Sequence, residues 1–226
     1  MTVVHAVAAH AQGGLTGQQS AQRDWSPYVV HFTNWKAMDY VRAALLHLEA
    51  SPKETYGLLT EADAKSAGTA AASLASGHLR RGSPSGKDGI PECVCLSECK
   101  LPGLIGHAER YGRFGFVFQK VDIFRAGGRP CAYLDEEHYT MIAELGRGKP
   151  ATTKEGRLFG LTNIYTPPGF GKIQDYTHER EWRIFDDVRL DAVPPIALLA
   201  PRTHLTTMKW HDVPVLPIDM LFDWGA

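Results

Sequence analysis

The sequence lacks any long apolar run, any excess of one charge and any large set of cysteines. No stretch approaches the roughly 20 apolar residues that a membrane-spanning helix needs, and no secretion signal is recognisable at the start of the chain. The 24 basic residues balance 25 acidic ones, for a formal charge of −1, so no overall charge draws the protein to nucleic acid or to anionic membranes. These absences predict a cytoplasmic protein that does not bind membranes, with only a local basic groove left open for nucleic acid.

The chain has four cysteines. Cys93, Cys95 and Cys99 lie close together and Cys131 lies apart. Even with His107 nearby, their spacing is not that of a zinc finger or ribbon, because there is no second Cys-x-x-Cys pair. Cys93 and Cys95 would share one face of a strand, where cysteine often packs as a small hydrophobe. A disulfide is disfavoured in the cytoplasm, so reduced core thiols and no metal site are predicted.

Hydrophobic periodicity and turn residues predict a single α+β domain over residues 25–226, in which two packed, mainly antiparallel sheets carry flanking helices. Residues 1–24, rich in Ala, Gly and Gln, are expected to form a mobile leader. Strands are predicted at Tyr28–Thr33, Cys93–Glu98, Phe114–Phe118, Cys131–Leu134, Leu158–Ile164, Glu179–Ile184, Ile196–Leu199 and Val213–Ile218. Helices are predicted at Lys36–Glu49, Glu61–Ala75, Leu101–Arg110 and Glu136–Leu145.

The run Glu179–Ile184 (EREWRI) carries the strongest functional signal. On a strand, Glu179, Glu181 and Arg183 point to one face, with the two carboxylates about 7 Å apart at Cα. Trp182 points to the other face and would anchor it in the core. Grouped carboxylates are costly unless they are paired or used. Two interpretations stay open: a solvated strand face with internal ion pairing, or a catalytic glutamate held on a rigid strand.

Two loops and one histidine are further candidates. His31 stands near the end of the first predicted strand, in a His-x-Thr sequence that closes with Thr33; such a histidine is either a hydrogen-bonded structural residue or a ribose or phosphate contact. The loop 78–89 is interpreted as a surface connection rather than a lid or phosphate contact. The loop Tyr165–Lys172 directly precedes the Glu179–Ile184 strand and is a natural place for substrate contacts.

Four short motifs, taken in order, resemble the signatures of the AbiGi family. They are Val94–Glu98 (VCLSE), Tyr111–Phe116 (YGRFGF), Pro130–Tyr133 (PCAY) and His178–Arg183 (HEREWR). The most specific of them is the EREWR run. The family is associated with abortive phage resistance and is described as a family of antitoxins. The resemblance therefore implies a phage-defence protein with a cognate toxin or antitoxin as its partner.

The order of elements is also similar to that of ADP-ribosyltransferases of the DarT type, which modify DNA. These proteins begin with a strand that carries a His-x-Thr motif and end with a strand that carries a glutamate. The resemblance implies an ADP-ribosyltransferase-like fold and NAD as substrate. Glu181 would hold the 2′-hydroxyl of the nicotinamide ribose and stabilise the oxocarbenium-like transition state by its charge. Glu179 would orient or deprotonate the acceptor.

The same resemblance implies a set of NAD-binding residues. His31 would contact the adenosine ribose, with Thr33 of the same motif beside it. Ser97 would shape the nicotinamide pocket, and Tyr111 is the nearest aromatic that could stack on nicotinamide. Arg183 would either bind the pyrophosphate or neutralise the carboxylates on its own face.

Two functions follow from these observations. The favoured one is an NAD-dependent ADP-ribosyltransferase-like protein of a phage-defence or toxin-antitoxin system, with nucleic acid, protein or water as acceptor. It predicts that His31, Ser97 and Glu181 converge on one cleft. The alternative is a non-enzymatic antitoxin or regulatory binding partner in an abortive-infection system. It predicts that the charges of Glu179–Arg183 are occupied by internal ion pairs.

Overall fold

The fold is known from a computed structural model, which describes residues 26–33, 61–82, 89–98, 104, 107–108, 111–166, 180–205 and 210–221, the side chains of 61–65 and 221 excepted. The predicted leader 1–24, the predicted helix Lys36–Glu49 and the candidate residue Glu179 lie outside this part of the chain. Among the helices that are described, none combines the length and the apolar character needed to cross a membrane.

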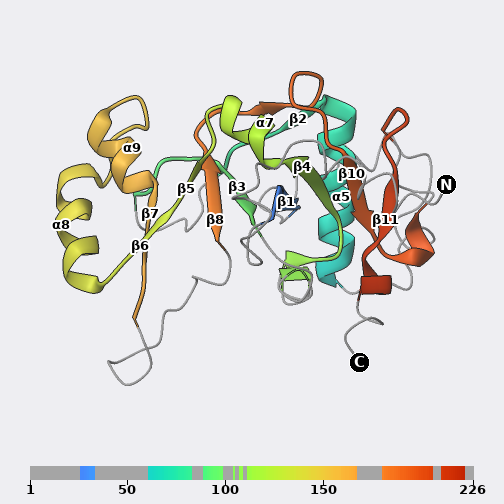
Figure 1. The fold of residues 1–226 in the computed structure, drawn as a ribbon, viewed down its shortest axis with the longest axis horizontal. Coiled ribbons are helices and arrows are strands. Elements are labelled where there is room, and N and C mark those ends of the chain that lie inside the picture. The colour runs from blue at the N-terminus through green and yellow to red at the C-terminus, as the bar shows by residue number, and fades with distance from the viewer. Residues whose placement is uncertain are drawn as a thin grey trace, which may run out of the picture.

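The described chain contains both strands and helices (Figure 1). The strands are β1 (Tyr28–Phe32), β2 (His78–Leu79), β3 (Val94–Ser97), β4 (Gly115–Gln119), β5 (Arg129–Pro130), β6 (Ala132–Leu134), β7 (Thr162–Ile164), β8 (Glu181–Ile184), β9 (Val188–Arg189), β10 (Ala197–Ala200) and β11 (Val215–Pro217). The helices are α5 (Glu61–Ser76), α7 (Lys120–Arg125), α8 (Glu136–Gly146) and α9 (Lys154–Gly160), with 3₁₀ turns η2 (Arg202–His204) and η3 (Ile218–Leu221). The described fold is α+β.

A seven-stranded sheet forms the centre of the molecule, with the strand order β11-β10-β4-β1-β3-β8-β5. All its neighbouring pairs are antiparallel except β10 and β11, which run parallel. Two small two-stranded sheets, β2-β9 and β6-β7, lie outside it. The strands β1, β3 and β8, which carry His31, Ser97 and Glu181, are therefore immediate neighbours.

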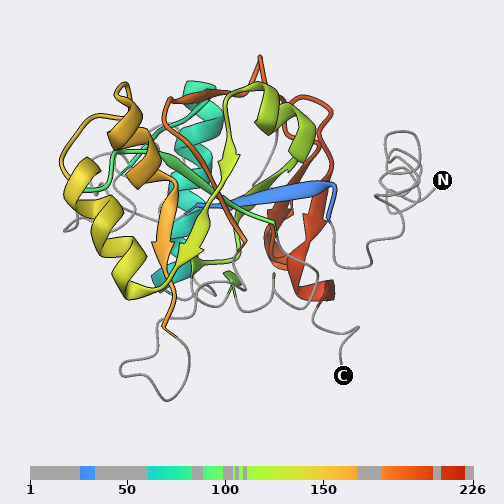
Figure 2. The ribbon, with the colours of Figure 1, turned by 60° about the vertical axis from the view of Figure 1, so that its left-hand side comes forward.

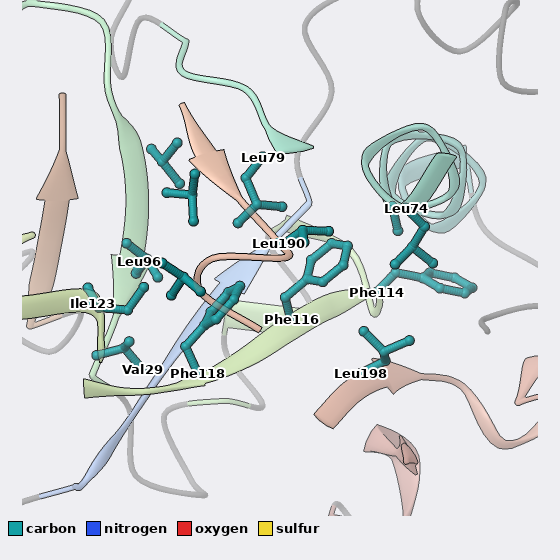
Figure 3. Close-up of a cluster of buried hydrophobic side chains, with 14 of the residues drawn as sticks. Val29, Leu74, Leu79, Leu96, Phe114, Phe116, Phe118, Ile123, Leu190 and Leu198 are labelled. Carbon is teal, nitrogen blue, oxygen red and sulfur yellow. The ribbon is translucent and has the colours of Figure 1, made fainter. Parts of the chain in front are cut away.

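One face of this sheet packs against α5 and is called the α5 face below. Ala67, Ala70 and Leu74 of the helix belong to the same buried cluster as the sheet residues Val29 and Phe116. Figure 3 shows Leu74 beside the row of phenylalanines that β4 and the residue before it contribute. The alanine-rich sequence favours a helix and lets its backbone approach the sheet closely.

The opposite side of the sheet is called the far face. A second buried cluster forms there around Val30, Phe32 and Val117, and Leu104 and Ala108 of a helical segment pack on it. Successive residues of a strand point to opposite faces, which is why Val29 and Val30 belong to different clusters. The predicted row of three phenylalanines at 114, 116 and 118 is confirmed, and all three are fully buried.

Beyond the end of the sheet that β8 and β5 form, the segment β6-α8-α9-β7 folds into a small β-α-α-β unit (Figure 2). Asp135 caps α8 by accepting from the His138 backbone N–H, and Thr153 caps α9 by accepting from that of Gly156. The two helices pack so closely that a Cβ added at Gly146 would overlap the carbonyl oxygen of Glu155. Only glycine allows this approach.

Two fold predictions are corrected by the structure. In the described residues no second large sheet packs on the first; α5 covers one face instead, and the segment that includes Leu104 and Ala108 covers part of the other. The predicted strand Leu158–Ile164 is also wrong in its first half. Residues up to Gly160 belong to α9, and the strand β7 begins at Thr162, because the Thr153 cap starts a helix within a polar stretch of the sequence.

Candidate functional site

Strand register places Ser97 and Glu181 side by side on the far face of the sheet. Ser97 is the ladder partner of Glu181 on β8 and of Val30 on β1. Ladder partners point to the same face, so Ser97 and Glu181 share the side on which Val30 is buried. Both residues are themselves buried, at 8% and 7% exposed. These two predicted site residues are brought together.

His31 and Thr33 point to the α5 face instead. His31 is paired with Phe116, whose ring lies 6.4 Å from the imidazole and belongs to the α5-face cluster. The imidazole Nδ1–H donates to the carbonyl of Cys95 at 2.7 Å. The structure therefore separates the His-x-Thr motif from Glu181 by the thickness of the sheet, and the predicted convergence of His31, Ser97 and Glu181 on one cleft is not what these strands build.

Thr33 has a structural role that the described contacts explain. Its fully buried hydroxyl lies 2.7 Å from the carbonyl of Ser66 in α5 and 3.0 Å from the carbonyl of Phe114. The Ser66 hydroxyl is 2.9 Å away. This network connects the end of β1 to α5 and to the start of β4, so the motif fixes the helix on the sheet.

Glu181 and Arg183 form a buried, two-pronged ion pair. The guanidinium donates from Nε to Oε1 at 2.9 Å and from its terminal nitrogen to Oε2 at 2.8 Å. Asn163 of β7 donates to Oε2 at 3.2 Å. Burial lowers the pKa of Arg183, but the attraction and hydrogen bonds of the Glu181 carboxylate outweigh burial and leave that pKa raised. The internal ion pairing predicted for this strand face is present between Glu181 and Arg183, but the face is buried and not solvated as that interpretation expected.

The same ion pair connects the sheet to the β-α-α-β unit. Arg183 also donates to the carbonyl of Gly160 at 2.7 Å and to that of Thr162 at 3.2 Å. The backbone N–H of Glu181 donates to the Tyr133 hydroxyl at 2.9 Å. Every described oxygen around the guanidinium thus comes from Glu181 or from the α9–β7 segment, and the pair holds that segment against β8.

His107 was not among the predicted site residues, yet it joins two of them. Its Nε2 lies 3.1 Å from the Ser97 hydroxyl, and both groups are buried. Its ring centroid is 5.6 Å from that of Tyr111 and 6.0 Å from that of Phe32. His107 lies in the predicted helix Leu101–Arg110 and Tyr111 directly follows that helix. Their spacing of four residues was the signal that could have brought them together. Ser97, His107 and Tyr111 form one polar-aromatic cluster on the far face.

Of the described cysteines, Cys93 is buried and Cys95 and Cys131 are half-buried. The Sγ atoms of Cys93 and Cys95 are 3.6 Å apart, and this hydrogen bond together with burial raises the pKa of Cys95. Burial raises the pKa of Cys131 as well. No cysteine in the described part of the chain is in a disulfide, and no group of three or more His, Cys, Asp or Glu side chains there could hold a metal ion. A raised pKa disfavours the reactive thiolate, in agreement with core thiols.

A second buried ion pair lies on the α5 face where β8 begins. Glu98 accepts from the indole N–H of Trp182 at 3.2 Å, and the Lys120 ammonium lies 2.9 Å from its other oxygen. The Glu98 backbone N–H donates to the carbonyl of Arg180, whose φ of +41° is a strained value for a residue with a side chain. Sequence patterns gave no signal for Lys120. This network fixes how the chain enters the strand that carries Glu181.

The protonation of His31 should make the folding stability depend on pH. Burial lowers the pKa of His31 in the folded protein, and the Cys95 hydrogen bond opposes this only in part. The unfolded chain takes up the proton near pH 6.5, so stability is complete above that pH and falls as the pH drops through the lower folded value. Urea unfolding from pH 7.5 to 5 should show a shallower decline for His31→Gln than for the wild type; equal slopes would contradict this assignment.

Comparison with known proteins finds no matching family model, no matching curated protein and no matching solved structure. The resemblances to the AbiGi family and to ADP-ribosyltransferases, including the finer fold type that the second implies, therefore stay predictions.

Proposed function

We propose that this protein is a non-enzymatic binding partner in a phage-defence system of the abortive-infection type, with a cognate toxin or antitoxin as its target. The observation that carries the proposal is the Glu181–Arg183 ion pair. Internal ion pairing of the charges on this strand is what the hypothesis of a non-enzymatic binding partner predicts. The AbiGi-like motifs supply the biological setting.

The ion pair weighs against chemistry at Glu181 for an electrostatic reason. Stabilising an oxocarbenium-like sugar requires a carboxylate whose negative charge faces the substrate. Here Arg183 donates to both oxygens of Glu181, and Asn163 donates to one of them. The Glu181 side chain is also only 9% exposed. The charge is therefore compensated within the protein by Arg183 and Asn163, which supports a role for Glu181 in the fold and not in chemistry.

The test is NAD consumption by the purified protein, with DNA, RNA, cell extract and water offered as acceptors. Wild type and Glu181→Gln are both expected to show no turnover, and calorimetry should detect no NAD binding. Each sample is checked by circular dichroism at the assay temperature, because loss of the Glu181 charge weakens the fold. Turnover by the wild type that disappears in a folded Glu181→Gln protein would overturn the proposal.

An NAD-dependent ADP-ribosyltransferase is the second candidate, and the strand register favours it. Ser97 and Glu181 are direct ladder partners on one face, and His107 brings Tyr111 to Ser97. This candidate requires Arg183 to leave Glu181 and bind the pyrophosphate of NAD instead. The same NAD assay decides between the two functions, and the acceptor that supports turnover would identify the substrate class.

A further inference from the structure

The thiols of Cys93 and Cys95 lie against each other on the far face of the sheet. Cys95 is the ladder partner of Arg183, so it shares the face of the Glu181–Arg183 ion pair. Cys93 stands two residues earlier in the chain and points the same way. The two Sγ atoms are 3.6 Å apart, and no described cysteine is in a disulfide. Two thiols are therefore held next to each other without a covalent bond between them.

Neither thiol belongs to the apolar clusters of the sheet. Cys93 is only 3% exposed, yet the cluster on the α5 face and the cluster on the far face both leave it out. Among the described contacts, the hydrogen-bonding partner of each sulfur is the other sulfur. Cysteine often packs as a small hydrophobe, but this packing leaves the pairing of the two sulfurs unexplained.

The backbone holds both cysteines firmly in place. Cys93 exchanges two hydrogen bonds with Gly82, each 2.9 Å long. Cys95 lies within β3, and its carbonyl accepts from the His31 imidazole at 2.7 Å. The separation of the sulfurs is thus set by paired strands, and a ligand that needs two sulfurs would meet them already positioned.

The charged row beside the thiols is positive overall. Arg183 is the ladder partner of Cys95 on one side and of Arg129 on the other, so these three residues form one row across the sheet. Among the described contacts, Glu181 supplies the carboxylate bonded to this row. Two guanidinium groups and one carboxylate leave an excess of one positive charge. Such surroundings favour a bound group that carries negative charge.

We propose that Cys93 and Cys95 bind one soft, monovalent metal ion of the Cu(I) class through their two sulfurs. Soft thiolate ligands select Cu(I). Each thiol gives its proton to solvent as its sulfur binds the ion, and copper stays in the +1 state. The ion and two thiolates then carry one negative charge, opposite to that of the neighbouring row. With metal–sulfur bonds of about 2.3 Å, sulfurs 3.6 Å apart subtend about 100° at the ion, which leaves room for a further ligand from solution.

The number of ligands distinguishes Cu(I) from zinc. Zinc takes at least three protein ligands, whereas no group of three or more His, Cys, Asp or Glu side chains in the described part of the chain could hold a metal ion. Cu(I) accepts a pair of sulfurs without a further protein ligand. A disulfide between the two cysteines is disfavoured, because residues two apart on an extended strand have Cα atoms about 6.6–6.8 Å apart, at the upper limit for a disulfide.

The test is transfer of Cu(I) from its coloured bicinchoninate complex to the reduced, full-length protein under anaerobic conditions. The wild type is expected to take up one ion per chain, with loss of the colour. Cys93→Ser and Cys95→Ser should each abolish uptake, because a single thiol does not compete with the chelator. Cys131→Ser is the matched control: it removes a half-buried thiol outside the pair and should keep full uptake.

Three results would overturn the proposal: no uptake by the wild type, uptake that both Cys93→Ser and Cys95→Ser retain, or uptake that Cys131→Ser also loses. Circular dichroism checks that each serine variant is folded. X-ray absorption at the copper edge of the loaded wild type needs no variant and should show sulfur neighbours at about 2.3 Å; nitrogen or oxygen neighbours alone would contradict the assignment. The inference goes beyond the proposed function, and the NAD assay is independent of all these results.

Discussion

Replacing Arg183 with methionine is expected to lower the free energy of unfolding by about 3–5 kcal/mol. The change leaves the buried Glu181 carboxylate without its cation and removes the donors of the Gly160 and Thr162 carbonyls. Urea unfolding followed by circular dichroism measures the loss. It should be accompanied by faster amide exchange in β7, because the pair holds the α9–β7 segment on β8.

The matched control is Arg189→Met, which breaks an exposed ion pair with Asp191 and should change the stability far less than Arg183→Met does. The double variant Glu181→Leu with Arg183→Met removes both charges and should be more stable than Arg183→Met alone. If the double variant were as unstable as the sum of two large single losses, the buried pair would not be the reason for the effect.

Replacing Glu98 with glutamine is expected to cost about 3 kcal/mol by the same mechanism on the other face of the sheet. Glutamine keeps the size of the side chain but leaves the buried Lys120 ammonium without a carboxylate and weakens the bond from the Trp182 indole. Because Trp182 is 8% exposed, its fluorescence in thermal unfolding reports the change directly.

Two further variants separate charge from packing at Glu98. Lys120→Met added to Glu98→Gln should recover part of the loss, since no unpaired charge then stays buried. Asp187→Asn, at the more exposed pair with Arg80, should have an effect of less than about 1 kcal/mol. A Glu98→Gln protein with wild-type stability would show that Lys120 reaches water when its partner is neutral.

Much of the fold could be predicted from two features of the sequence: the alternation of side chains between the two faces of a strand, and the residues that cap helices. Helix α8 was predicted within one residue, because Asp135 is a strong N-cap and the apolar spacing is helical. The burial of Trp182 and the shared face of Glu181 and Arg183 follow from the period of two along a strand. Helix α9 was missed because it is only seven residues long and its Thr153 cap lies in a polar stretch.

Which residues meet at the candidate site was harder to predict, because the site depends on contacts between segments that are distant in the sequence. Strand alternation placed Glu181 beside Arg183, but not beside Asn163, 18 residues earlier. His31 also follows alternation, yet its face could be assigned only once the pairing of Val30 with Ser97 was known. Register across strands is a tertiary property, and short motifs in the correct order do not fix which side of a sheet each residue occupies.

The strand order also determines when the centre of the protein can form during synthesis. β3 lies between β1 and β8, and the bond from Trp182 to Glu98 joins residues 84 positions apart. At about 5–20 residues per second, roughly 4–17 s separate the translation of these two residues. Over that interval β3 lacks its β8 neighbour, and the edge that β8 later covers is open to chaperones and to other nascent chains.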